Sequence, residues 1–409
     1  MVKFAVDSAG GSIAADSAAT DADGEAVTNW TLGVSTAADY RVTVTVPGFT
    51  APIPDLRASG LAGPPFNMEI ISGDSQATMV GMELSAPLQI RLTDMFDNPV
   101  PGHGVVWRTP GGAGWVAADT TSTDRNGIAQ VQRTLGTTLG PQSTEAEVVG
   151  GAMPPGFFTS SATPLLSAYD IDLRFTGTVP LAVETAVRAA AARWSRIIVG
   201  DVPSASTLGA RDYCGVASLL PATVDDISIV VQVRDSIDGP GGFLGGGYPC
   251  LDRASLLTVV GRVAIDAADL PDLEADGILD ALVLRAIGEA IGFGYLWAYH
   301  TPTLAIGSMA LGPEFIGPHA TRQFNLNRGT LPRRTSVPIE PSTDPWDWTW
   351  ALPGEYPYWR ETVMGRELMT PVLNPGANPL STITIAAFAD MGYTVSYAEA
   401  DPYNVELSA

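Results

Sequence analysis

The chain has 409 residues, with 44 acidic and 22 basic side chains, a net charge of −22 and a pI near 4.3. This charge argues against nucleic acid or an anionic lipid face as a partner, because both would repel the chain. The length exceeds the ~100–200 residues of one domain, so we expect two or three domains. No stretch approaches the ~20 apolar residues needed to cross a bilayer.

An internal repeat lies in the first part of the chain. TDADGEAVTNWTLG at 20–33 returns as TDRNGIAQVQRTLG at 123–136. The Asp-Gly and Asn-Gly dipeptides supply the positive φ angles of tight turns, and strand-like residues follow each of them. The repeat therefore predicts a β-hairpin inside each of two domains of about one immunoglobulin length, ~100 residues.

The acidic residues of these turns invite a calcium interpretation. Asp21 and Asp23 form one cluster, and Asp124 and Asn126 form the other. Neither is accompanied by a full oxygen cage, so we interpret both as turns rather than as ion sites.

The two copies predict the domain boundaries. The copy at 66–164 is whole, with alternating segments such as PLQIRLTD and GVVWRT separated by turns. The copy at 1–52 lacks the opening strands that the repeat leads us to expect, and 53–65 is a linker. An incomplete sandwich has open strand edges, which we expect a partner chain or another part of this one to cover.

The segments LQIRLTDMFDNPVPG and TDRNGIAQVQRTLG resemble the bacterial immunoglobulin-like domains of the invasin and intimin type. The resemblance covers nearly all of 66–164 and the latter part of the preceding copy. It implies all-β sandwich modules that act as spacers or adhesive stalks outside the cell.

Beyond residue 164 the pattern becomes mixed α and β. A helix is predicted where Val183, Val187, Ala191, Trp194 and Ile198 share one face. The other predicted elements are strands at 169–177, 226–235 and 258–266 and a helix at 279–291. The glycine-rich stretch DGPGGFLGGGYPC is interpreted as a loop, and it lacks the Lys-Ser/Thr ending of a phosphate-binding loop.

The stretch LRAIGEAIGFGYLW at 284–297 resembles the zinc helix of leishmanolysin-like metzincins. The matching positions are Gly288, Gly292, Phe293, Gly294, Leu296 and Trp297. Further segments resemble the same family, including YDIDLRFTGTVP, AAAARWSRIIVGD and PYWRETVMGRELMTPVLNPGANPLSTITIAAFADMGYTV. The resemblance implies an α+β metzincin-like domain over 165–409, with Met369 in its methionine turn.

The resemblance also implies which positions would carry the zinc ligands, and this chain has none of the family's ligands at those positions. Arg285 and Glu289 occupy the two helix histidine positions, Ala286 the glutamate position and Tyr358 the third histidine position. Arginine has no lone pair to offer a metal. Without a metal-bound water or a base, peptide hydrolysis has no nucleophile, so we expect an inactive relative with no catalytic residue, metal or cofactor.

Spacing predicts what fills this position. Arg285 and Glu289 are four residues apart on one helical face, so we expect an ion pair with Tyr358 near enough to hydrogen-bond to one of them. The alternative is that both side chains point to solvent.

The histidines and cysteines give little support to a different metal site. His103, His300 and His319 lie in separate segments and are interpreted as solvated loop residues, and a relocated zinc site at His300 and His319 is the alternative. Cys214 and Cys250 share no metal-binding spacing, so we expect a disulfide and an oxidising, extracytoplasmic location, periplasm or cell surface. The opening MVKFAVDSAGG carries no export signal, so we expect that signal upstream or lost by truncation.

These features together predict a non-catalytic structural or binding subunit docked into a larger assembly of protein subunits. A surface layer, an adhesive filament or a membrane-protein complex would fit. The aromatic stretch at 344–359 is either core or partner surface. Two alternatives remain: a peptide-binding module using a relict cleft along the strand at 258–266, and an active metallopeptidase with altered ligands.

Overall fold

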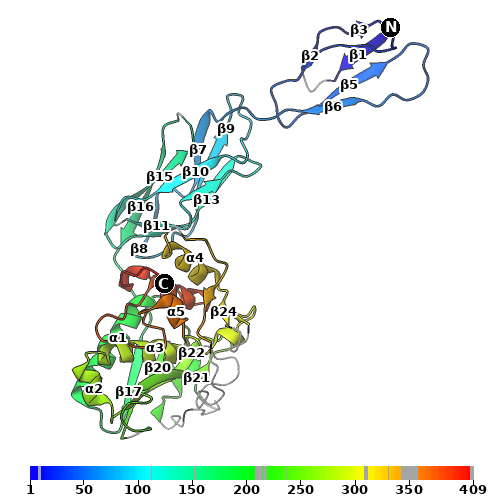
Figure 1. Cartoon of the computed structure of the whole chain (residues 1–409). Coiled ribbons are helices and arrows are strands. Elements are labelled where there is room, and N and C mark those ends of the chain that lie inside the picture. The colour runs from blue at the N-terminus through cyan, green and yellow to red at the C-terminus, as the bar shows by residue number, and fades with distance from the viewer. Residues whose placement is uncertain are drawn as a thin grey trace. The chain divides into compact units, whose positions relative to one another are not determined.

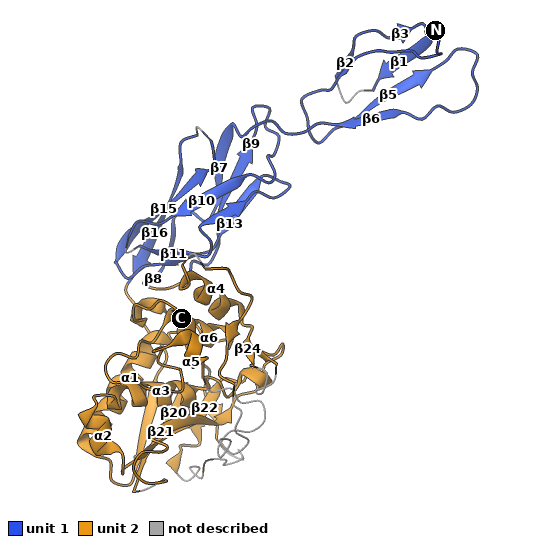
Figure 2. Cartoon of the chain, viewed as in Figure 1, with its two compact units in different colours: residues 1–78, 83–163 blue, residues 79–82, 164–409 orange. Residues whose placement is uncertain are grey.

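The computed structural model forms two compact units (Figure 2). Unit 1 comprises Met1–Thr78 and Glu83–Thr163, and unit 2 comprises Met79–Met82 and Pro164–Ala409. The residues that the structure describes are 1–7, 11–111, 113–151, 153–207, 214, 219–235, 237–307, 312–329, 331–341 and 358–405. Within these ranges, no helix combines the length and apolar character that a bilayer-spanning segment requires.

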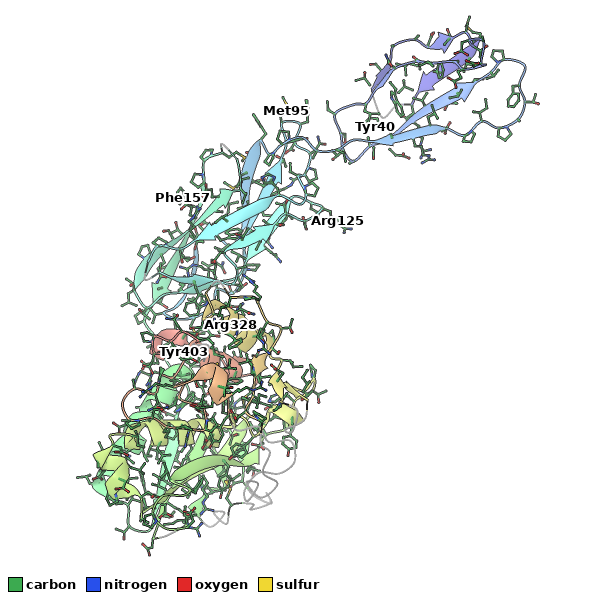
Figure 3. All side chains as sticks on the ribbon, in the orientation of Figure 1. Tyr40, Met95, Arg125, Phe157, Arg328 and Tyr403 are labelled. Atoms are coloured by element: carbon green, nitrogen blue, oxygen red, sulfur yellow. A yellow bond between two sulfur atoms is a disulfide. The ribbon has the colours of Figure 1, made fainter. Side chains whose placement is uncertain are left out.

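The first part of unit 1 is a small β structure around Tyr40. Its sheet has the order β3 (Ser17–Ala18), β1 (Val2–Val6), β5 (Asp39–Thr45) and β6 (Leu56–Ser59), and β2 (Ser12–Ile13) pairs with β4 (Trp30–Thr31). Tyr40 is fully buried and its hydroxyl donates to the Ser35 carbonyl at 2.8 Å (Figure 3). The predicted linker at 53–65 is wrong in part, because β6 lies within it and pairs with β5.

The second part of unit 1 is a β-sandwich. One sheet has the order β12 (Thr120–Ser122), β10 (Gly104–Arg108), β15 (Gly140–Val148), β16 (Gly156–Thr163) and β8 (Gln76–Met79). The other has the order β13 (Ile128–Val131), β9 (Leu88–Thr93) and β7 (Asn67–Ser72), and β11 (Gly114–Val116) pairs with β14 (Arg133–Leu135). Alternating side chains point inward, and Trp107 packs on Phe158 with ring centroids 5.9 Å apart. The sandwich strands span the predicted domain at 66–164. Within that range, Met79–Met82 belong to unit 2.

The repeated turns are real, but the predicted hairpins are wrong. The Asp124 carboxylate accepts from the backbone N–H groups of Asn126 and Ile128, and Asp21 accepts in the same way from Asp23 and Glu25. The strands on either side of each turn belong to different sheets. A turn that carries the chain from one layer to the other uses the same Asx geometry as a hairpin, so the sequence signal does not separate the two. Both aspartates are occupied by backbone donors, as expected for turns.

Unit 2 is built on a four-stranded sheet with the order β17 (Ile171–Thr176), β20 (Ile227–Arg234), β22 (Thr258–Asp266) and β21 (Gly245–Asp252). The first three strands are parallel, and β21 runs antiparallel to β22 at the edge. Two expectations from the sequence are wrong. The strand at 258–266 is interior, so it cannot line an open cleft with its edge, and the edge strand β21 begins inside the predicted glycine loop.

Two helices of unit 2 were predicted and are confirmed. Helix α1 (Leu181–Ile197) buries the predicted apolar face, and α3 (Leu279–Ile291) packs on β20, β21 and β22 (Figure 1). The other helices are α2 (Leu270–Ala275), α4 (Pro318–Leu326), α5 (Glu361–Met364), α6 (Thr382–Asp390), η2 (Trp297–Tyr299) and η3 (Tyr397–Glu399). The remaining strands are β18 (Ala205–Ser206), β19 (Thr223–Val224), β23 (Ala305–Ile306), β24 (Glu314–Phe315) and β25 (Val337–Pro338).

Candidate functional site

Helix α3 lies in the core of unit 2, and its sequence reflects close packing on two sides. The indole N–H of Trp194 donates to the Leu284 carbonyl at 2.9 Å, and a Cβ added at Gly288 would lie 2.7 Å from the same indole. The helix ends at Gly292, whose φ of 124° favours glycine. Glycine at these two positions is thus required by packing and by backbone conformation.

The edge strand β21 approaches α3 so closely that only glycine fits. A Cβ added at Gly247 would overlap the Ala286 carbonyl oxygen. A Cβ added at Gly261 on β22 would lie 2.7 Å from the Ala290 carbonyl oxygen. Glycine is normally unfavourable in a strand, and here the near contact of strand and helix backbones explains it.

Arg285 and Glu289 lie together beneath the surface of unit 2. Arg285 is 5% exposed and Glu289 is 1% exposed, and Arg285 Nε lies 3.9 Å from Glu289 Oε1. Neither of these two atoms has a hydrogen-bond partner. The pair is therefore an ion pair at the long end of the range, and the solvent-exposed alternative is wrong.

Both side chains are held mainly by the protein's own backbone. Arg285 Nη1 donates to the carbonyls of Thr370 and Pro371 at 3.2 and 3.1 Å. Glu289 Oε2 accepts from the Gly247 N–H at 2.8 Å. The guanidinium and the carboxylate thus tie α3 to two segments that are distant in sequence.

The other predicted positions lie around this pair. The Arg285 guanidinium carbon lies 5.4 Å from the centre of the Tyr358 ring, and the nearby Tyr358 side chain acts to lower the pKa of Glu289. Ala286 is fully buried between them on α3, and Met369 is the buried neighbour of the Thr370 carbonyl that binds Arg285. All five predicted positions therefore gather at one place.

Burial dominates the electrostatics of the site. It raises the pKa of Glu289, against the lowering effects of Arg285, the Gly247 N–H and Tyr358. Burial likewise raises the pKa of Glu367, although this carboxylate accepts from Ser381, Thr384 and the Met369 N–H. Glu367 thereby fixes the turn that carries Met369.

The outer edge of β21 offers few backbone donors. The Gly247 N–H points to Glu289 and therefore away from β22. Backbone directions in a strand repeat every two residues, so the backbone nitrogens at positions 245 and 249 also point away from β22. Position 249 is proline, which has no N–H. Glu289 and Pro249 therefore remove two of these three outward donors, a common way of protecting an edge strand from pairing.

A pocket of about 50 Å³ opens beside Glu289 and the edge strand. Its lining is Arg234, Ile237, Phe243, Gly246, Gly247, Tyr248, Arg262, Ala264, Glu289, Tyr295 and Tyr358. The two arginines and the role of Gly247 were not predicted from the sequence. Three consecutive glycines followed by a tyrosine and a proline were the available signal for a close-packed edge strand.

The remaining sequence candidates lie elsewhere. Cys214 and Cys250 form the predicted disulfide, with Cα atoms 5.7 Å apart. His103 Nε2 bonds to the Val149 carbonyl in unit 1, and the backbone N–H of His319 donates to Asp390. Burial lowers the pKa of His300.

A zinc ion does not fit the residues at the predicted site. Arg285 contributes no lone pair, Ala286 contributes no donor, and Glu289 is committed to Gly247 and Arg285. In the part of the chain that the structure describes, no group of three or more His, Cys, Asp and Glu side chains is placed to hold a metal ion. Of the aromatic stretch at 344–359, only Tyr358 and Trp359 fall within the described residues, and Trp359 is fully buried against Trp297.

Comparison with known proteins gives distant structural neighbours. No family model matches the sequence, and no curated protein matches it. The D0-D1 domain of intimin aligns with 38% of this chain and 80% of its own, at 20% identity and a TM-score of 0.19. The Escherichia coli adhesin FdeC aligns with 39% of this chain and 53% of its own, at 19% identity and a TM-score of 0.28. InvD of Yersinia pseudotuberculosis aligns with 44% of this chain and 50% of its own, at 14% identity and a TM-score of 0.31.

These neighbours are bacterial immunoglobulin-like adhesin domains. The chain spans about half of the length of FdeC and of InvD.

Proposed function

We propose that the protein is a non-catalytic, extracytoplasmic scaffold subunit, in which immunoglobulin-like modules carry a relict metzincin-like domain that binds other proteins. One observation carries the proposal. The two side chains at the helix positions of the expected zinc ligands, Arg285 and Glu289, are buried and bonded to the protein's own backbone. A zinc hydrolase needs these positions to carry neutral imidazoles with free lone pairs.

The surroundings of the edge strand favour a scaffold over a peptide-binding module. An extended peptide binds an edge strand through backbone hydrogen bonds at alternate residues. On β21 the Gly247 N–H is already bonded to Glu289, and Pro249 has none to offer. An added strand would find an interrupted ladder.

Two further observations support an exported protein with binding surfaces. The Cys214–Cys250 disulfide is typical of proteins folded in oxidising compartments. Unit 1 exposes several large apolar side chains, and such side chains mark a contact surface where they form one contiguous patch. They include Val27, Phe49, Leu61, Phe66, Met95 and Phe96.

Zinc titration and a peptidase assay test the loss of chemistry. We expect the purified chain to bind no zinc stoichiometrically and to cleave no peptide. The positive control is a variant with Arg285→His, Ala286→Glu, Glu289→His and Tyr358→His, which places the family's four groups on the same backbone. Stoichiometric zinc binding by the wild-type chain, abolished by Glu289→Ala, would contradict the proposal.

A further inference from the structure

The pocket beside Glu289 carries more positive than negative charge, in a chain whose net charge is −22. Arg234 and Arg262 are both in its lining. Its one acidic lining residue, Glu289, is paired with Arg285. The pocket is therefore a local basic site on an acidic protein.

The side chain of Arg262 is held in place by several contacts within the protein. Its Nη1 donates to the Tyr248 hydroxyl at 2.9 Å and to the Cys214 carbonyl at 3.3 Å, and its Nη2 donates to Gln232 Oε1 at 2.5 Å. Its guanidinium also lies over the Tyr248 ring at 5.8 Å. These contacts fix the guanidinium in place before any ligand arrives.

All of these acceptors are uncharged. Among the described residues no carboxylate lies within ion-pair distance of Arg262, and its Nε–H is buried without an acceptor. A partly buried guanidinium without a counter-ion is unusual, because burial of a charge is costly unless an opposite charge accompanies it. An anionic group would supply the opposite charge that the described residues do not place beside Arg262.

Arg234 adds a second charge from the neighbouring strand. It stands at the end of β20, opposite Asp266 in the register with β22, and its side chain is exposed. The Asp266 carboxylate is already occupied by the N–H groups of Ile237, Asp238 and Ala268. Within the described ranges, no hydrogen bond or ion pair engages the Arg234 side chain, which leaves it for a ligand.

We propose that this pocket is a socket for one carboxylate of a partner protein, an Asp or Glu side chain that enters between Arg234 and Arg262. The volume of about 50 Å³ suits a single group, since a water needs roughly 10–15 Å³ on this measure. Arginine pairs well with a planar carboxylate, and the side chains of Tyr295 and Tyr358 also line the pocket. A blocked edge strand beside an open socket fits the side chain of a partner better than an extended backbone.

The socket rests on the proposed scaffold function, and it is tested with a small probe. The probe is N-acetyl-aspartyl-N-methylamide, titrated into the whole chain by NMR, with the asparagine analogue as the neutral control. We expect saturable binding of the aspartyl probe and none of the analogue. Arg262→Gln and Arg234→Gln should each weaken binding by about tenfold or more, the value of a lost charge-assisted hydrogen bond. Because the Arg234 side chain is exposed, we expect the Arg234→Gln chain to fold, so a loss of binding in this variant is not caused by misfolding.

Arg125→Gln is the matched control, because Arg125 is exposed in unit 1 and its loss changes the net charge equally (Figure 3). Binding that is equal in all three variants, absent in the wild type, or matched by inorganic phosphate overturns the socket. If the chain co-isolates with partner proteins but does not bind the probe, the proposed scaffold function stands and the proposed socket is wrong. If the chain binds the probe but isolates without partner proteins, the proposed scaffold function is wrong instead.

Discussion

The carboxylate of Glu289 accepts the backbone N–H of Gly247 at 2.8 Å, from a helix position 42 residues further along the chain. The same carboxylate faces Arg285 one helical turn earlier. One side chain therefore neutralises a buried arginine and also occupies a donor on the edge of the sheet. A residue where the metzincin resemblance places a zinc ligand serves here to hold helix and sheet together.

Replacing Glu289 tests the structural value of that pairing. Glu289→Ala leaves Arg285 buried and unpaired and the Gly247 N–H without an acceptor, so we expect the free energy of unfolding to fall by roughly 3–5 kcal/mol. For a unit of this size the melting temperature should drop by at least roughly 6 °C. Glu184→Ala is the control, because Glu184 forms an exposed i,i+4 pair with Arg188 that is worth about 0–1 kcal/mol. A drop of less than about one degree in Glu289→Ala would count against a buried ion pair.

A change at Gly247 tests the approach of β21 to α3. In Gly247→Ala the added methyl group would overlap the carbonyl oxygen of Ala286. This oxygen belongs to the backbone of α3, which cannot move aside as a flexible side chain can. We expect unit 2 to lose more than about 4 kcal/mol or to fail to fold, as measured by circular dichroism and urea titration. Gly111→Ala should be tolerated, because an added Cβ there meets nothing within 4 Å. A Gly247→Ala chain as stable as the wild type would show that strand and helix lie further apart.

These two residues show where the sequence was informative and where it was not. A helix from about 279 to 291 was predicted and matches α3, and the spacing of Arg285 and Glu289 predicted their pairing, because this spacing depends only on local helix geometry. The Gly247 contact depends on how β21 lies across α3, which no local pattern encodes. The glycines that permit this contact have low strand propensity, so β21 was mistaken for a loop.

The same distinction applies to unit 1. The turns at Asp21 and Asp124 were predictable, because an aspartate that accepts its own downstream N–H groups is a local feature. Which sheet receives the next strand is decided by packing across the sandwich, so the hairpin prediction failed. Pairing of Cys214 with Cys250 was predictable because the chain has no other cysteines.

Acid should weaken unit 1 through Asp94. Burial raises the pKa of this carboxyl, but hydrogen bonds from Asn98 and from the N–H groups of Gly63 and Phe96 outweigh it and lower the pKa from 3.8 to about 2. A lowered folded pKa means that the stabilisation is present above pH 3.8 and is lost as the pH falls toward 2. Urea unfolding across this window should show a stability gap between wild type and Asp94→Asn that narrows on acidification. A gap that stays constant across the window would refute this role of Asp94.

Arg133 supports the sandwich core, and no carboxylate among the described residues forms an ion pair with it. It is fully buried, burial lowers its pKa to about 10, and it donates to Thr144 Oγ1 at 2.8 Å and to the carbonyls of Trp115, Thr134 and Ala113. Arg133→Met leaves these acceptors unsatisfied, so we expect a loss of about 2–4 kcal/mol in the unfolding of unit 1.

The matched comparison for Arg133 is the exposed Arg125. Arg125→Gln should change the free energy of unfolding by no more than about 0.5 kcal/mol. If Arg133→Met proves as stable as Arg125→Gln, the hydrogen bonds of the buried guanidinium do not support the fold.

The most direct test of the scaffold function is gentle isolation of the native protein from its source. Mass spectrometry would identify the proteins that accompany it, and metal analysis would be run on the same sample. We predict protein partners in stoichiometric amounts and no bound zinc. A solitary chain that carries one zinc ion would contradict the account and restore the case for a peptidase with altered ligands.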